Sequence, residues 1–328
     1  MTPERILLVR IDRIGDMLTS TPVFTALRRT YPQARIDLVA SSLNIDAVRR
    51  NPDLNETFLF PLKRFWMWPL LWARLRARRY DWAVDLNPSY SRSSGFLVWF
   101  CGARETFSFE KVKGNGFYEN RSPQRPEEHM IDRQLNLSRA LGALKTSPQM
   151  TFVVSEQARE RAQQIYGKRS RPLRVGIFIG NAKKVHSRWP AGKFAELTEK
   201  LMRDQNLEIF ILAGPTDRPL LAAFHSLGSD RCRIEQEGTL EDSGALLETC
   251  DLLITSSSGP MHLAAALGVP TLSILADHTY ACWRPLGEIH HAVHCSGEDV
   301  RNIGVEDVLK ESQKILEDRT AHAPLSYC

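Results

Sequence analysis

Short apolar runs alternate with amphipathic stretches along most of the chain. Runs of about four to eight residues rich in Val, Ile and Leu are typical of buried strands, whereas apolar positions three or four residues apart indicate helices. Their alternation predicts an α/β protein with doubly wound parallel sheets. We expect helices from the loop at residues 12–17 through Val23 and Leu27 to Tyr31, at about 191–204, from Asp217, and near 305–316. Strands are predicted at residues 5–11, 35–41, 57–61, 81–86, 173–180, 208–214, 251–255 and 271–275.

The pattern starts a second time at the strand predicted for residues 173–180. A chain of 328 residues is also long for one hydrophobic core. We therefore expect two Rossmann-like domains, residues 1–168 and 169–328, joined by a linker at 166–172. Ligands of such two-lobed proteins bind in the cleft between the lobes, so loops from both halves are expected to contribute to the site.

Residues 256–270, SSSGPMHLAAALGVP, form a small-residue turn that leads into a short predicted helix. The first N–H groups of a helix have no partner inside it, and the helix dipole is positive there, so such a turn can bind phosphate. Gly259 permits close approach of a ligand, and the hydroxyl groups of Ser256, Ser257 and Ser258 can cap the helix or bind the anion. A turn of this kind also occurs without any ligand, and this second interpretation stays open at this point.

A second strand-to-helix loop, DRIGDM at residues 12–17, carries two carboxylates beside Gly15. Asp16 lies at the predicted helix start, where the helix dipole favours a negative charge. It is either a capping acid or a functional carboxylate. The loop has one glycine where the dinucleotide fingerprint G-x-G-x-x-G has three, which disfavours a nicotinamide-dependent enzyme.

Together these loops resemble the heptosyltransferases of glycosyltransferase family 9, which join two Rossmann-like halves in the GT-B fold. Residues 9–39 are similar to the opening strand, catalytic-aspartate loop and first helix of the family, and residues 256–270 to its donor-phosphate motif. SRWPAGKFAEL at 187–197 resembles the K-x-W-P segment of the family, and LAGPTDRPL at 212–220 its Gly-rich nucleoside turn. The four segments occur in the family's order.

The resemblance implies an inverting, metal-independent glycosyltransferase that acts in lipopolysaccharide biosynthesis, with ADP-heptose as the default donor and an acidic core glycolipid as acceptor. Asp16 would be the general base that takes a proton from the acceptor hydroxyl, as one carboxylate does in inverting glycoside hydrolysis. Arg13 and Gly15 would lie at the acceptor. The residues expected at the donor are Lys183, Lys184, Arg188, Asp217, Ser257, Ser258, Gly259, Met261 and His262.

Within that donor set, the roles differ. The helix start at residues 258–261 and the two lysines would neutralise the leaving diphosphate, and Asp217 would accept hydrogen bonds from the ribose. By spacing alone, His262 reads as a structural hydrogen-bonding residue in an Ala-rich helix. The resemblance instead places it at the donor, where an imidazole can bond a phosphate oxygen or a sugar hydroxyl.

Two positions depart from the family pattern. Ser257 stands where an acidic residue usually holds the transferred sugar, and Ser187, followed by Arg188, stands where a lysine precedes Trp-Pro. These departures leave two alternatives open beside the transferase. One is another nucleotide-sugar enzyme such as an epimerase, for which His186, Glu237 and Glu241 are acid/base candidates. The other is a non-catalytic protein that only binds the nucleotide sugar.

Charge is divided unequally between the halves. Residues 1–168 carry 26 Lys/Arg and 17 Asp/Glu, a net of +9, whereas residues 169–328 carry 17 and 21, a net of −4. The basic half suits an anionic acceptor or an anionic membrane surface. The segment from Phe65 to Trp82 concentrates aromatic and arginine residues, including Trp66, Trp68 and Trp72, and reads either as an interfacial helix or as a sheet-covering helix whose core stripe is Leu70, Leu71 and Leu75.

Other classes of protein are disfavoured. No run approaches the roughly 18 apolar residues of a membrane span, and no signal peptide is visible, so we expect a cytoplasmic protein, peripheral to the inner face of the inner membrane if the helix is interfacial. The six cysteines include no C-x-x-C pair and no D-x-D motif is found in a suitable loop, so we expect no metal and no cofactor. No nucleic-acid-binding motif is present.

Overall fold

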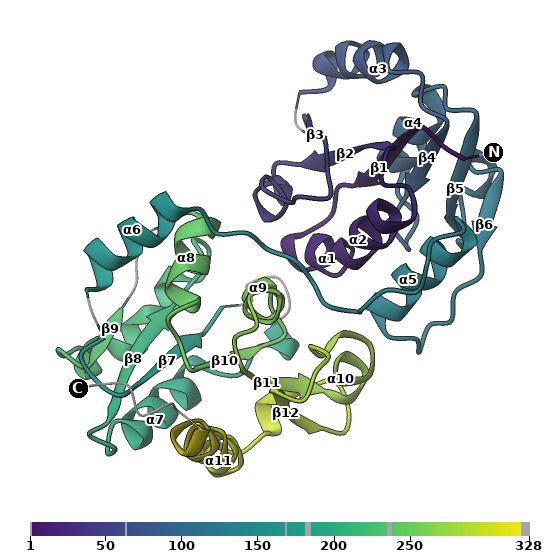
Figure 1. Cartoon of the computed structure of the whole chain (residues 1–328). Coiled ribbons are helices and arrows are strands. Elements are labelled where there is room, and N and C mark those ends of the chain that lie inside the picture. Colours follow the sequence, from purple (N-terminus) through teal and green to yellow (C-terminus); the bar gives the residue numbers. More distant parts are fainter. Residues whose placement is uncertain (1, 63, 168, 181–184, 235–237, 323–328) are drawn as a thin grey trace. The chain divides into compact units, whose positions relative to one another are not determined.

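The computed structural model describes residues 2–62, 64–167, 169–180, 185–234 and 238–322. Contacts divide the chain into two compact units, Met1–Val153 and Val154–Cys328 (Figure 1). Each unit is built on a parallel sheet of six strands against which helices pack. The predicted α/β architecture with two Rossmann-like parallel sheets is confirmed.

In the first unit the sheet has the order β3-β2-β1-β4-β5-β6. Its centre is β1 (Arg5–Arg10), in which the apolar residues from Ile6 to Val9 are fully buried, as the apolar run predicts, and Arg10 is fully buried as well. The other strands are β2 (Arg35–Ser41), β3 (Glu56–Phe60), β4 (Trp82–Asp85), β5 (Glu105–Phe109) and β6 (Asn120–Ser122). The α-helices are α1 (Ile14–Leu18), α2 (Thr21–Thr30), α3 (Trp68–Ala77), α4 (Arg92–Phe100) and α5 (Met130–Ala140).

The second unit repeats this plan with the order β12-β11-β10-β7-β8-β9. Its strands are β7 (Leu173–Phe178), β8 (Leu207–Leu212), β9 (Cys232–Ile234), β10 (Leu252–Ser256), β11 (Thr271–Ala276) and β12 (His290–Cys295). Its helices are α6 (Glu156–Tyr166), α7 (Ala191–Leu201), the 3₁₀ helix η5 (Arg218–Leu227), α8 (Leu240–Leu247), α9 (Gly259–Ala266), α10 (Asp277–Trp283) and α11 (Val305–His322).

The strand order fixes where each unit can hold a ligand. In both sheets the first strand of the unit lies between the second and the fourth, which is the order of the dinucleotide-binding Rossmann fold. The order reverses between β1 and β4 in the first unit and between β7 and β10 in the second. Ligands of open parallel sheets bind beyond the carboxyl ends of the strands at such a point. The loops that follow these four strands are therefore the candidate ligand loops.

The long helix predicted after the first strand is two helices. α1 ends at Leu18 and α2 begins at Thr21. The hydroxyl groups of Thr19 and Ser20 both donate to the Asp16 carbonyl, at 3.0 and 2.9 Å. Side-chain hydroxyls that bond the preceding turn compete with the backbone N–H groups that would continue the helix. The break keeps α1 short, with Asp16 in its first turn.

The boundary between the compact units lies at Val153, before the predicted boundary at residue 168. Helix α6 belongs to the second unit because it packs on α8 through charged pairs. The Arg159 Nε donates to Glu248 Oε2 at 2.7 Å, and Arg161 forms a 2.7 Å ion pair with Asp242. Since these partners lie more than 80 positions away in the sequence, local patterning could not assign the helix to either half.

Four strands were not predicted from the sequence, namely β5, β6, β9 and β12. β6 and β9 have only three residues each, which is too short for a periodic signal. β12 reads HHAVHC, and its histidines mask the strand pattern. The helix expected from Asp217 is the 3₁₀ helix η5, in which Pro219 occupies the first turn. The four strands lie outside the centres of the two sheets, away from the points where the strand order reverses.

Candidate active site

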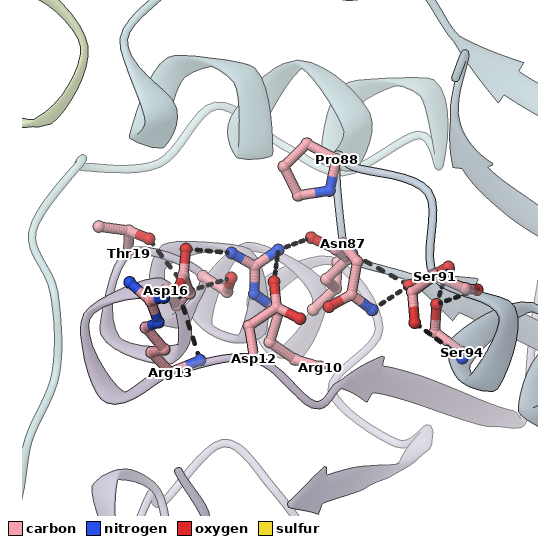
Figure 2. Close-up of polar contacts among 12 residues, drawn as sticks. Arg10, Asp12, Arg13, Asp16, Thr19, Asn87, Pro88, Ser91 and Ser94 are labelled. Carbon is pink, nitrogen blue, oxygen red and sulfur yellow. Dashed lines mark hydrogen bonds and ion pairs between the residues drawn. The ribbon is translucent and has the colours of Figure 1, made fainter. Parts of the chain in front are cut away.

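A buried arginine organises the loop after β1. Arg10 is the last residue of that strand and is fully buried. Its Nη2 lies 3.3 Å from Asp16 Oδ1 and its Nη1 lies 3.7 Å from Asp12 Oδ2, so one guanidinium is shared by two carboxylates (Figure 2). Nη1 also donates to the Leu86 carbonyl. A planar guanidinium with several fixed donors suits this task, which a lysine could not perform in the same geometry.

Asp16 occupies the third position of α1 and acts as a capping acid. Its Oδ2 accepts the backbone N–H of Arg13 at 3.4 Å while Oδ1 faces Arg10 (Figure 2). The side chain keeps 22% of its surface exposed. The structural interpretation of this residue is therefore correct, and it does not conflict with a chemical role, because a carboxylate has more acceptor positions than these two contacts use. The predicted acceptor residues lie beside it, with Arg13 exposed and Gly15 partly buried in the first turn of α1.

Asp12 is the second carboxylate of this loop, and its environment is less favourable to charge. Burial raises the pKa of Asp12 above its ordinary value, and the nearby Asp16 and Asp85 carboxylates add to the rise, while Arg10 opposes it. Two carboxylates close to one guanidinium carry a net negative charge. The loop after β1 therefore concentrates negative charge beside one buried cation.

A buried polar cluster lies at the end of β4, and sequence reasoning did not anticipate it. The Asp85 carboxylate is fully buried and accepts from Lys111 Nζ at 2.7 Å, from Tyr118 Oη at 2.5 Å and from Ser94 Oγ at 2.8 Å. Its second oxygen accepts the backbone N–H of Asn87 at 3.0 Å. Burial and the Asp85 charge together raise the pKa of Tyr118, so the phenol stays a donor. This cluster fixes the start of the loop after β4.

The two networks meet at residue 86. The sheet register pairs Val9 of β1 with Asp85 of β4, and the Leu86 N–H donates to the Val9 carbonyl at 2.9 Å. The Leu86 carbonyl accepts from Arg10 and also from Gln134 Nε2 of α5 at 2.9 Å. Asp85 thus fixes the start of the loop after β4. The Leu86 carbonyl of that loop accepts from Arg10, and Arg10 in turn orients the Asp16 carboxylate. The position of Asp16 therefore depends on residues from β1, β4 and α5.

In the second unit, β10 leads into α9 as predicted. Ser258 is the N-cap residue, and its Oγ accepts the Met261 N–H at 3.3 Å and lies 2.9 Å from Thr255 Oγ1. Met261 is fully buried, so only its backbone can take part in binding. His262 is also buried, with its ring edge against Trp283 at a centroid distance of 6.1 Å. Ser257 and Gly259 are only partly buried, which leaves them accessible at the helix start.

The Trp-Pro segment is attached to this same loop. The Trp189 N–H donates to Ser256 Oγ at 3.0 Å, and its indole Nε1 donates to the Ile303 carbonyl at 3.0 Å. The Trp189 side chain is fully buried in the core of the second unit. Segments 67 residues apart in the sequence are thereby joined at the carboxyl end of β10. The predicted positions Lys183 and Lys184 lie outside the described residues.

Arg188 and Asp217, two residues predicted at the donor, form an ion pair with a 3.8 Å separation of Nη1 and Oδ1. Asp217 is 5% exposed and lies over two glycines. A Cβ atom at Gly180 would come within 2.4 Å of Asp217 Oδ2, and one at Gly214 within 3.2 Å. The absence of side chains there makes room for the carboxylate. These contacts bring the loops after β7 and β8 together.

Comparison with known proteins identifies the family. Residues 68–311 match the profile of glycosyltransferase family 9 (heptosyltransferase), which is most of the chain. The chain belongs to glycosyltransferase family 9. It is 26% identical over 290 residues to lipopolysaccharide heptosyltransferase 2 of Escherichia coli K12, a match that covers 82% of each chain.

Solved structures of this family share the fold. The structure of E. coli ADP-heptose lps heptosyltransferase II matches with a TM-score of 0.82 at 23% identity, over 96% of this chain and 99% of that one. A glycosyl transferase family 9 protein from Veillonella parvula DSM 2008 matches with a TM-score of 0.84 at 21% identity, over 96% and 97% of the two chains. Family membership favours the transferase over the epimerase and over the non-catalytic binding protein. Among the helices of the described residues, none is both long and apolar enough to cross a bilayer.

Proposed function

We propose that this enzyme transfers heptose from ADP-heptose to the core of lipopolysaccharide. The observation that carries the proposal is the Asp16 carboxylate, held by Arg10 at the carboxyl edge of β1 and still partly exposed. The name of the E. coli relative, a lipopolysaccharide heptosyltransferase, supports the acceptor class. A relative of known structure, E. coli ADP-heptose lps heptosyltransferase II, supports the donor.

The reaction we propose is an inverting displacement at the anomeric carbon of the donor. The acceptor hydroxyl oxygen attacks that carbon, Asp16 takes the hydroxyl proton, and the bond to the diphosphate breaks with both electrons leaving on ADP. Arg10 keeps the carboxylate aimed and supplies it with a hydrogen bond at 3.3 Å. Arg13 and Gly15, in the same loop, would contact the acceptor, and the net charge of +9 on residues 1–168 would attract its acidic groups.

In this proposal the second unit stabilises the negative charge of the leaving diphosphate. Gly259 and the N–H groups at the start of α9 provide positive partial charge, and Lys183 and Lys184 would add full charges, so the transfer needs no metal ion. Met261 would contribute only its backbone. Asp217 would accept hydrogen bonds from the donor ribose and can do so while it stays near Arg188, since a carboxylate has about four acceptor positions.

The two departures from the family pattern bear on the sugar. Ser257, a short neutral side chain, replaces the acid that usually holds sugar hydroxyls, so the second unit would contact the heptose through a hydroxyl in place of a carboxylate. Arg188, which already pairs with Asp217, would take over from the lysine replaced by Ser187. Neither change removes the proposed base. Glu241, one of the acid/base candidates for an epimerase, accepts the Ser155 N–H at 2.8 Å and so has a structural role.

A panel of ADP-, GDP-, UDP- and dTDP-sugars tests the donor assignment by thermal shift without added metal. We expect ADP-sugars to stabilise the protein most. Asp16→Asn tests the base, because the amide keeps the shape of the side chain but cannot take a proton, and should lower kcat by about 10²- to 10⁴-fold with donor binding intact. Asp46→Asn is the matched control, since Asp46 is an exposed acid of the same unit that pairs with Arg49. Equal turnover of Asp16→Asn and the control would contradict the assigned base.

A further inference from the structure

The segment 65–77 has apolar side chains on two opposite faces. Its inner face packs on the core of the first unit through Leu71 and Leu75, which are buried, and through the partly buried Trp68 and Trp72. This confirms the sheet-covering interpretation of the segment. Leu70 was also expected in the core stripe, and that prediction is wrong, because 59% of its surface is exposed. The side chains left outside need a separate explanation.

The outer face carries large apolar groups in an exposed position. Phe65 and Trp66 of the 3₁₀ helix η2 (Phe65–Met67) are 71% and 65% exposed, and Leu70 lies one helical turn further on. The rings of Phe65 and Trp66 contact each other edge to face at a centroid distance of 5.4 Å. Figure 1 shows α3 at one end of the first unit. Exposed aromatic clusters of this kind mark interaction sites rather than ordinary surface.

The segment that carries these rings is basic. No Asp or Glu occurs between Glu56 and Asp81, whereas six Lys or Arg residues do. Arg78 forms a 2.7 Å ion pair with Glu56 and is neutralised by it. The arginines of this segment that remain exposed are Arg64, Arg74, Arg76 and Arg79. Exposed aromatic rings and exposed arginines on one segment suit the interface of an anionic membrane.

Arg79 adds an independent observation. It follows the C-cap Arg78 of α3 and has a φ of 52°, the only positive φ of a non-glycine residue in the described chain. This left-handed position after a helix is usually occupied by glycine, which adopts it without strain. The chain thus has an exposed cation at a site where the backbone favours glycine.

We propose that Phe65, Trp66 and Leu70, with the exposed arginines of the same segment, form a membrane-docking surface that inserts its rings among the headgroups of an anionic bilayer. The occupant is the lipid bilayer itself. The proposal goes beyond the transfer reaction and needs no particular donor, although a docked first unit would place Asp16 near lipid-anchored acceptors. Each exposed arginine is expected to strengthen binding about fivefold, since a basic residue near an anionic surface contributes about that factor.

Vesicle sedimentation of the full-length enzyme tests the surface. The wild type should bind vesicles of phosphatidylcholine with phosphatidylglycerol, bind pure phosphatidylcholine weakly, and be released by salt. Phe65→Ser with Trp66→Ser should weaken binding by about tenfold or more without lowering Tm, because both side chains are exposed. Leu144→Ser with Ile165→Ser is the matched control, since these side chains are 64% and 60% exposed elsewhere, and should leave binding unchanged.

Arg79→Gly isolates the charge. Glycine adopts a positive φ without strain, so Tm should stay constant or rise. Vesicle binding should fall about fivefold, because one exposed cation is lost. A lipid-embedded acceptor should then be glycosylated more slowly by the Phe65/Trp66 variant, whereas a deacylated, water-soluble acceptor should be glycosylated at the wild-type rate. If the wild type transfers to neither acceptor, the proposed function fails, and vesicle binding still decides the docking surface.

Three results would overturn the docking surface. The first is a wild type that binds anionic vesicles no better than the Phe65/Trp66 variant does. The second is equal loss of transfer to both acceptors, which would make the segment part of the acceptor site. The third is a wild-type dimer that the Phe65/Trp66 variant converts to a monomer in sedimentation velocity, which would assign the surface to a second copy of the chain.

Discussion

Replacement of Arg10 should show whether catalysis depends on the position of the Asp16 carboxylate, because the variant keeps Asp16 and removes the side chain that holds it. Arg10→Met keeps most of the side-chain volume but removes the contacts to Asp12, Asp16 and the Leu86 carbonyl. Gln134 still donates to that carbonyl at 2.9 Å, so no buried backbone oxygen is left without a hydrogen bond. The main loss is the cation between the two carboxylates. Asp16 is then held only by the Arg13 N–H, at the long distance of 3.4 Å.

The magnitude of the effect follows from the distances. At 3.3 and 3.7 Å, each carboxylate is attracted to the guanidinium by about 4–5 kcal/mol at an effective dielectric constant of about 20, before the desolvation of a fully buried arginine is subtracted. Removal of one partner of a buried pair costs about 3–5 kcal/mol. The Asp12 and Asp16 side chains remain 32% and 22% exposed, so water can hydrate them. We therefore expect a loss of about 3 kcal/mol of unfolding free energy.

The kinetic readout distinguishes positioning from stability. A base displaced by about 1 Å costs roughly 10²-fold in rate, so Arg10→Met should lower kcat by about that factor while KM for the donor stays close to the wild-type value. Arg10→Lys restores the charge but not the planar set of donors. It should recover most of the unfolding free energy and only a small part of kcat. Urea denaturation and steady-state kinetics at fixed temperature measure the two quantities.

Equal recovery of stability and kcat by Arg10→Lys would show that charge alone is needed, and the positioning role of Arg10 would be refuted. The same conclusion would follow if folded Arg10→Met kept kcat within about threefold of wild type, because a positioning residue must change the rate by more than this. Should Arg10→Met not fold, the lysine variant still decides between the two interpretations.

Three further predictions concern other parts of the chain. Burial lowers the pKa of His290 to about 4, so below pH 6.5 the folded state binds fewer protons than the unfolded state does. The free energy of unfolding should therefore fall by about 2 kcal/mol between neutral pH and about pH 5. Urea denaturation should show that His290→Gln abolishes this loss. Lys111→Met leaves the buried Asp85 carboxylate without its cation and should lower the free energy of unfolding by about 3 kcal/mol. A loss under about 1 kcal/mol in chemical denaturation would refute the pair as a structural support. Gly180→Ala places a Cβ 2.4 Å from Asp217 Oδ2 and should weaken binding of the donor nucleotide about tenfold by calorimetry, with unchanged affinity as the contrary result.

The ligand loops were predictable because their signals are local. A buried apolar run followed by a capping residue and a helical pattern identifies the loops at Asp16 and Ser258, and both lie at the carboxyl ends of central strands. The structure adds that Ser258 caps α9 and that Asp16 accepts the Arg13 N–H at the start of α1. The same local patterns predicted four of the six strands of each sheet, since strands buried on both faces form continuous apolar runs.

The supports of the site were not predictable, because they depend on contacts between distant segments. Arg10 reads as one charged residue in an apolar strand, and only the fold brings the Leu86 carbonyl, 76 positions away, to its guanidinium. Asp85 finds Lys111 and Tyr118, which are 26 and 33 positions away. These pairings cannot be predicted from residue type or from spacing in the sequence. A lysine in a polar loop is normally exposed, whereas Lys111 is buried.

Helix α3 shows a limit of periodicity itself. Leu70 and Leu71 are both leucines, and the helical period alone cannot say which faces the sheet. The inner line is set by packing of Trp68, Leu71, Trp72 and Leu75 on the first unit, which turns Leu70 outward. The exposed fraction of each side chain, and with it the docking surface, is a property of the folded chain.

The most direct test of the transferase assignment is a single transfer experiment. Purified enzyme is incubated with ADP-heptose, a chelator and core glycolipids truncated at successive sugars, and the products are examined by mass spectrometry and by NMR of the new anomeric centre. We predict addition of one heptose with inverted configuration by the wild type, and a rate at least about 10²-fold lower for Asp16→Asn. A product of retained configuration, or equal rates for the two proteins, would contradict the assignment of Asp16 as the base of an inverting transfer.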